Sequence, residues 1–211
     1  MSKKHGQLTS RRGAEAAPGR LKFSEDAIQV TPDGAIAIDA SKLETPANVY
    51  DADFAWVQKR LGAVSLFFAK ADLNAKDRLR TRLELRYPVE GFIEHFWNNS
   101  RNFHRIIREY VQQLPVASVG ERPAVESWEA LKDHSEWVNF SYLARVGSQS
   151  ALDFFNLAVP GVVQFTKGQG TSGLIIKPVT RVLTTTAALN HLLDSCEPLA
   201  EELQKTEALH G

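Results

Sequence analysis

The sequence has one cysteine and one methionine among its 211 residues, and it has no long apolar run. One thiol excludes an intrachain disulfide framework and favours a reducing compartment. A transmembrane helix needs about 20 consecutive apolar residues, and no segment approaches that length. The polar segment Met1 to Gly6 opens the chain and no apolar stretch follows it, so we expect no secretory signal. The predicted location is the cytoplasm, with no membrane contact.

An excess of one charge is also missing, because 25 Lys and Arg residues balance 25 Asp and Glu residues. The charges are nevertheless segregated along the chain. Residues 59–108 hold eleven bases and five acids, whereas residues 185–211 hold one base and five acids. Two interpretations stay open: the opposite charges neutralise each other within the fold or between subunits, or the basic segment meets an anionic partner.

Signatures of catalysis are absent from the sequence as well. The segment Gly168 to Gly173 matches G-x-G-x-x-G, but the strand-like Leu174 to Ile176 follows where a dinucleotide-binding fingerprint needs a helix. We interpret this segment as a hairpin loop. Glu94, His95 and His104 share one predicted helix, where their spacing points them in different directions. We therefore predict a protein that is not an enzyme and that holds no cofactor and no metal.

The feature that is present is a pattern that occurs twice: a strand hairpin, a loop, another strand, then Pro-Val and an amphipathic helix. The pairs Pro88-Val89 and Pro178-Val179 stand 90 positions apart. This pattern predicts an α+β fold made of two tandem repeats of antiparallel strands followed by an amphipathic helix. The predicted organisation is a disordered basic arm at 1–20, a small hairpin and connector at 21–48, repeat 1 at 49–111, a linker at 112–136, repeat 2 at 137–204 and a tail at 205–211.

In the first repeat, alternating apolar residues predict one strand from Tyr50 to Trp56, a second from Val64 to Phe68 and a third from Leu79 to Tyr87. Pro88 is suited to the first turn of a helix, because its missing N–H is not needed there. The weak helix formers Asn98 to Ser100 predict a kink or break in that helix.

In the second repeat, the residues from Trp137 to Tyr142 predict the first strand, with a turn near Gly147 and a second strand from Leu152 to Leu157. A helix is predicted from Pro178, and Pro198 should end or kink it. Cys196 lies on the apolar stripe of this helix, so we expect it in the core. Before the repeats, a hairpin is predicted between residues 28 and 38.

Alternation also places a row of arginines on one face of the third strand of repeat 1. Successive side chains on that face are roughly 7 Å apart, close to the phosphate spacing of an extended single strand, and arginine both binds phosphate and stacks on bases. The other interpretation is a polar outer face whose arginines pair with acids such as Asp51 and Asp53. The candidate anion-binding, nucleic-acid-binding or interface residues are Arg78, Arg80, Arg82, Arg86, Arg101, Arg105 and Arg108.

Short motifs in repeat 2 carry a family resemblance. The runs Val138-Asn139-Phe140 and Leu152-Asp153-Phe154, with Ser148, Pro160 and the later Pro178, resemble a small bacterial domain-of-unknown-function family built as a strand hairpin, a further strand and a long helix. That family has no assigned activity, so the resemblance implies a fold and no functional residue. The layout is also similar to export chaperones of the SecB kind and to duplicated single-strand-DNA binders of the Whirly or Pur kind.

Together these observations predict a non-catalytic protein-binding or assembly module, homo-oligomeric, whose sheets or sheet edges contact a protein partner. The alternative is a single-stranded nucleic-acid-binding protein that uses the arginine face and the basic arm.

Overall fold

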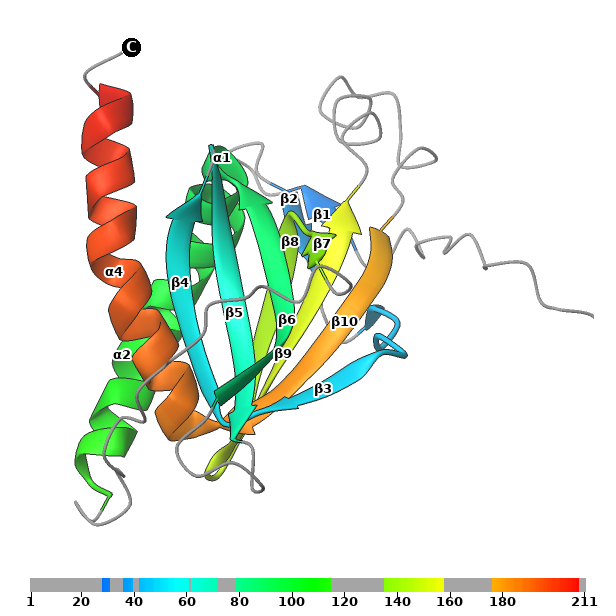
Figure 1. Cartoon of the computed structure of the whole chain (residues 1–211). Helices are drawn as coiled ribbons and strands as arrows, with labels where there is room; N and C mark the ends of the chain where they lie inside the picture. Colours follow the sequence, from blue (N-terminus) through cyan, green and yellow to red (C-terminus); the bar gives the residue numbers. More distant parts are fainter. Residues whose placement is uncertain are drawn as a thin grey trace, which may run out of the picture.

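The computed structural model describes an α+β protein with two four-stranded sheets, a separate two-stranded hairpin and two long helical segments, at residues 89–112 and 186–208 (Figure 1). The hairpin consists of β1 (Ile28–Val30) and β2 (Ile36–Ile38), which pair antiparallel as predicted. The described residues are 28–30, 36–39, 42–60, 62–71, 79–114, 135–157 and 176–208. The predicted arm at 1–20, residues 115–134 of the predicted linker and the segment Gly168 to Gly173 lie outside them.

The first sheet has the strand order β4-β5-β6-β7. β4 (Phe54–Arg60), β5 (Ala63–Ala71) and β6 (Leu79–Pro88) are antiparallel neighbours, and β7 (Ser135–Trp137) lies parallel to β6. The second sheet has the order β3-β10-β9-β8. β8 (Phe140–Val146), β9 (Gln149–Leu157) and β10 (Ile176–Thr185) are antiparallel, and β3 (Val49–Ala52) lies parallel to β10.

The fourth strand of each sheet therefore comes from the other half of the chain. β3 directly precedes β4 but pairs in the second sheet, and β7 precedes β8 but pairs in the first. The predicted single strand from Tyr50 to Trp56 is consequently wrong. It breaks at Asp53, whose N–H donates to the Ala69 carbonyl and whose carboxylate accepts from the Ala71 N–H. The predicted strand that starts at Trp137 is likewise two strands.

A continuous helical segment follows β6, and it begins after Pro88 as the sequence predicts. It consists of α1 (Val89–Gly91), the π-helical η3 (Phe92–Trp97) and α2 (Asn98–Gln112). Helix continues through Asn98 to Ser100, so the predicted break does not occur, and a kink there stays a prediction; the Ser100 hydroxyl donates to the Phe96 carbonyl. The irregularity is the π-helical turn just before them.

The second helix, α4 (Thr186–Ala208), starts eight residues after the predicted Pro178. Pro178 lies within β10, next to an irregularity in the pairing with β9, where its missing N–H is tolerated. The β-branched Val179, Thr180 and Val182 favour the extended backbone that follows. Pro198 lies inside α4, so the helix does not end at that residue, and the other predicted outcome, a kink, stays a prediction.

The two halves share their hydrogen-bond register. Phe54 lies opposite Ala69 in the first hairpin, and Phe140 lies opposite Phe155 in the second, so both positions are shifted by 86 residues. The third strands, β6 and β10, each contain one extra residue at the same point of the ladder. These residues are Arg82 in β6 and Val179 in β10, which are 97 positions apart. The predicted common helix offset of 90 is therefore wrong, and an origin of the two halves by sequence duplication stays a prediction.

The core lies between the two sheets and the long helices. Phe68 of β5 and Phe154 of β9 meet with ring centroids 5.8 Å apart, and both are fully buried. α4 packs against β4 and η3 packs against β8, so each helix covers an edge strand of the opposite half. Cys196 of α4 is buried as predicted, and its burial raises the pKa of the thiol.

Candidate functional site

The outer face of the second sheet is the face turned away from the core. Leu152 and Val182 point into the core, so the residues next to them on β9 and β10 point outward. Strand pairing places Tyr142 opposite Asp153, Asp153 opposite Arg181, and Arg181 opposite Val49. We define the outer face of the second sheet by Val49, Asp51, Tyr142, Ala144, Val146, Ala151, Asp153, Arg181 and Leu183; Phe140 and Phe155, the next row on the same side, are excluded because Phe155 is only 2% exposed.

Exposed apolar side chains gather on this face. In the described part of the chain, six large hydrophobic residues are exposed, and four of them belong to it. These four are Val49 at 52% exposure, Tyr142 at 45%, Val146 at 83% and Leu183 at 38%; the other two are Ile106 on α2 and Trp137 on β7. Single exposed hydrophobic residues are ordinary, whereas a group of several on one face is typical of interaction surfaces.

An ion pair lies in the middle of the same face and is largely buried: the Arg181 side chain is 31% exposed and the Asp153 side chain 12%. Arg181 Nε donates to Asp153 Oδ1 at 2.6 Å and Arg181 Nη2 donates to Asp153 Oδ2 at 2.7 Å. The hydrogen bonds to Asp153 raise the pKa of Arg181 above its usual value. The two charges cancel, so the centre of the face is polar but carries no net charge.

The outer face of the first sheet has a different composition. Trp56 of β4 stacks on Phe67 of β5 with ring centroids 5.3 Å apart, and the Arg60 guanidinium lies 5.4 Å from the centre of the Phe67 ring. Trp137 lies beside Arg86 in the pairing of β7 with β6, and it is 53% exposed. Aromatic rings and guanidinium groups therefore dominate this face.

A buried carboxylate organises the centre of that first face. Glu84 accepts hydrogen bonds from Ser65 at 2.8 Å, from Arg86 at 3.1 Å and from Ser135 at 3.2 Å. Burial alone would raise the pKa of Glu84, but these hydrogen bonds outweigh it and hold the pKa below its usual value. The carboxylate is ionised and already satisfied by its neighbours.

The predicted arginine row does not form one face. The extra residue in β6 shifts the pairing, so Arg80 lies opposite Lys70, on the side to which Phe68 points. Arg82 is the extra residue itself, so it is exposed but left out of the pairing, and Arg86 is bound to Glu84. Arg78 lies outside the described residues.

The three arginines predicted on the helix separate as well. Arg101 and Arg105 are exposed on α2, whereas Arg108 binds Asp194 and Glu197 of α4, each at 2.8 Å. These hydrogen bonds raise the pKa of Arg108. The structure therefore does not bring the seven predicted arginines together.

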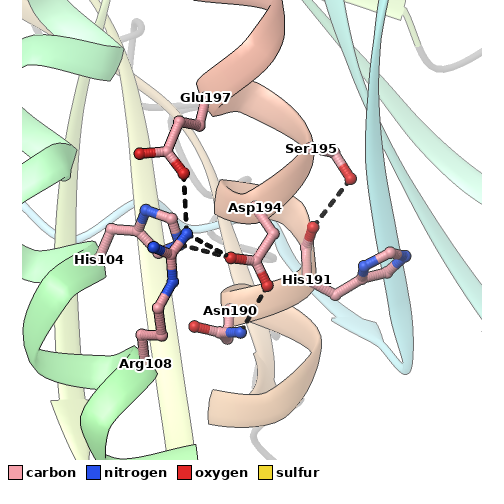
Figure 2. A network of polar contacts seen from close by, with 7 residues as sticks. All are labelled: His104, Arg108, Asn190, His191, Asp194, Ser195 and Glu197. Carbon is pink, nitrogen blue, oxygen red and sulfur yellow. Dashed lines mark hydrogen bonds and ion pairs between the residues drawn. The ribbon is translucent and has the colours of Figure 1, made fainter.

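Arg108 belongs to a polar network that joins α2 to α4 (Figure 2). The Nε2 atom of the buried His104 lies 2.9 Å from Asp194 Oδ1, and Asn190 Nδ2 donates to the other carboxylate oxygen at 2.8 Å. Burial raises the pKa of Asp194, but the bonds from Arg108 and His104 outweigh it and lower the pKa overall. The same Nε2 atom lies 3.2 Å from Arg108 Nη2, so His104, Arg108 and Asp194 form one polar cluster.

The network holds two helices together and presents no nucleophile. Ser195, the neighbouring hydroxyl, donates to the His191 carbonyl instead, as Figure 2 shows. Sequence reasoning missed this cluster because 90 residues separate His104 from Asp194. The predicted neighbours Glu94 and His95 form an exposed contact of 3.7 Å elsewhere on the first helix.

The described residues contain no group of three or more His, Cys, Asp or Glu side chains suited to a metal ion, and none of their helices is long and apolar enough to cross a membrane. No family model matches the chain, and no curated protein or solved structure matches it either.

Proposed function

We propose that this protein is a non-catalytic binding or assembly module, and that it binds another protein chain through the outer face of the second sheet. The observation that carries the proposal is the concentration of exposed Val49, Tyr142, Val146 and Leu183 on one sheet face. Removing apolar surface from water is the main favourable term in protein association.

Other features of the face agree with a protein partner. Tyrosine and arginine are enriched at protein interfaces, and Tyr142 and Arg181 both belong to this face. Its charges are already paired, so a partner needs no excess of opposite charge to bind. A single-stranded nucleic acid, by contrast, needs a surface with unpaired cations.

Photo-crosslinking tests this proposal. Benzoylphenylalanine replaces Tyr142 in one full-length variant and Ile106 in a matched control, since Ile106 is exposed to a similar extent but lies on α2. After illumination in cells that express the protein, we expect a covalent protein adduct at position 142 and none at position 106. The additional change Leu183→Asp should abolish the adduct. Equal adducts at both positions, or none at 142, would contradict the proposal.

A second candidate function is binding of single-stranded nucleic acid on the outer face of the first sheet. The observation that favours it is the exposed Trp137 on the same face as Arg60, in a sheet that also carries the exposed Arg82. Aromatic rings stack on bases of any sequence, and guanidinium groups bind phosphates. The dispersal of the other predicted arginines makes this face less basic than the sequence implies.

A further inference from the structure

The outer face of the second sheet is complementary to itself. Strand pairing arranges its side chains in rows that run across the four strands. One row reads Val49, Arg181, Asp153, Tyr142, and the next reads Asp51, Leu183, Ala151, Ala144. Within each row, a large or positive side chain on β10 stands next to a small or negative one on β9.

We propose that a second copy of this chain binds this face, with the two sheets stacked face to face about a two-fold axis. The axis lies midway between the two sheets, runs parallel to the strands and passes over the gap between β9 and β10. This inference rests on the proposed function, and it specifies the partner and the geometry. Rotation about such an axis reverses the order of each row. Arg181 of one copy then lies over Asp153 of the other, and Asp153 lies over Arg181.

The charges favour this arrangement over other two-fold stackings. Arg181 uses two guanidinium N–H groups on its own Asp153, and a guanidinium has five such donors. The remaining donors can reach the carboxylate of the second copy, because packed sheets lie about 10 Å apart. The result is a square of alternating charges. A stacking that placed Arg181 over Arg181 would bring like charges together in a water-poor contact.

The sizes of the side chains agree with the same axis. Leu183 of each copy lies over Ala151 of the other, so a large side chain meets a small one twice. The aromatic Tyr142 lies over Val49, and both are among the most exposed apolar side chains in the described part of the chain. Alternation of large and small residues is how two sheet faces interdigitate.

Two charge-reversal variants test the proposal, because each should dimerise weakly alone and the two should dimerise with each other when mixed. Arg181→Glu leaves two negative charges at the centre of the face, and Asp153→Arg leaves two positive charges. We expect wild type to sediment as a dimer, and each variant alone to dimerise at least about tenfold more weakly, which corresponds to 1.4 kcal/mol or more. An equimolar mixture should restore a dimer whose native mass is that of one copy of each variant.

A folding control accompanies the mixture, because each variant also breaks the pair within its own sheet. The double variant Arg181→Glu, Asp153→Arg keeps opposite charges in both places, so it should dimerise like wild type. Circular dichroism and thermal unfolding confirm that the single variants are folded. Single variants that still dimerise, or folded variants that form no mixed dimer, would overturn the proposed geometry.

A second measurement does not depend on charge. In the proposed stack Val49 lies over Tyr142 of the second copy, whereas the two Tyr142 positions lie about 14 Å apart laterally, three strand spacings. A bismaleimide with a spacer of about 10 Å should therefore link Val49→Cys to Tyr142→Cys in a mixture and link neither variant to itself. Cys196 is fully buried and serves as the unreactive background thiol. Links within each variant alone would contradict the axis.

The outcomes separate this inference from the proposed function. A wild-type chain that stays monomeric at high concentration overturns the second-copy stack. If photo-crosslinking at Tyr142 then captures a different protein, the proposed function stands and only the second-copy stack is wrong. If position 142 captures nothing, both fail.

Discussion

The two outer sheet faces are built on the same hydrogen-bond ladder and carry different chemistry. The position of Leu183 in the second sheet corresponds to Arg86 in the first, and the position of Ala151 corresponds to Ser65. On the inner faces, by contrast, Phe68 corresponds to Phe154. The core constrains its side of each strand to apolar residues, whereas the outer side is free to become a charged, hydrogen-bonded surface in one sheet and an apolar surface in the other.

The largest effect on stability is expected at the core position where both halves have phenylalanine. Phe68→Ala and Phe154→Ala should each lower the free energy of unfolding by about 3–5 kcal/mol, because each leaves a cavity between the sheets. Ile106→Ala is the control, since Ile106 is exposed and its truncation should change stability by less than about 0.5 kcal/mol. Urea unfolding gives all three values. A loss confined to one of the two phenylalanines would show that the halves do not share one core.

A smaller effect is expected at the carboxylate that distinguishes the first face. Glu84→Gln should destabilise by about 1–2 kcal/mol at neutral pH, because it removes charged hydrogen bonds to Arg86 and the two serines. The pKa of Glu84 is lowered in the fold, so its contribution is present above the unfolded-state pKa and is lost as the pH falls through the folded-state value.

The difference between wild type and Glu84→Gln should therefore shrink as the pH drops below about 4. Thermal unfolding from neutral to acidic pH measures this difference. Glu201→Gln, at an exposed position of α4, is the matched control and should follow wild type throughout. A Glu84→Gln difference that stays constant with pH would mean that the carboxylate charge contributes nothing.

The apolar second face should affect association rather than stability. Tyr142→Ser and Leu183→Ser should each weaken self-association by about tenfold while changing the free energy of unfolding by less than about 0.5 kcal/mol. Sedimentation equilibrium measures the first quantity and urea unfolding the second. Ile106→Ser on α2 and Trp137→Ser on the first sheet are similarly exposed controls. Equal weakening by all four variants would argue that no single face is responsible.

The smallest effect is expected for nucleic acid on the first face. Arg82→Ala and Trp137→Ala should weaken any binding of a labelled single-stranded oligonucleotide by a few fold, and the binding should fall steeply with salt. Fluorescence anisotropy at low and moderate salt measures it, with Arg101→Ala on α2 as the control. An absence of binding by wild type at low salt would leave the apolar face as the only proposed interaction surface.

Local patterns predicted much of this fold. The alternation of Leu83, Leu85 and Tyr87 located the buried side of β6, Pro88 located the start of the first helix, and Gly147, with a φ of 60°, lies in the predicted turn. These features depend on neighbours in the sequence. An α+β class follows from them directly.

Several of the errors involve partners that are distant in the sequence. The break at Asp53 is visible only once β3 is known to pair with β10, and the position of Arg80 depends on an extra residue opposite β5. Pro178 resembled a helix start because proline is suited to both a first helical turn and an irregular strand position. The outer face was missed because its residues come from four separate strands.

The exchange of β3 and β7 between the sheets also determines how the chain can fold. The Asn48 amide and the Val179 carbonyl, which lie where β3 meets β10, are separated by 131 residues. During synthesis β3 is complete long before β10 exists, so the second sheet closes only near the end of translation. Neither half can finish its sheet alone, and we expect one cooperative unfolding transition with slow, contact-order-limited refolding rather than two independent domains.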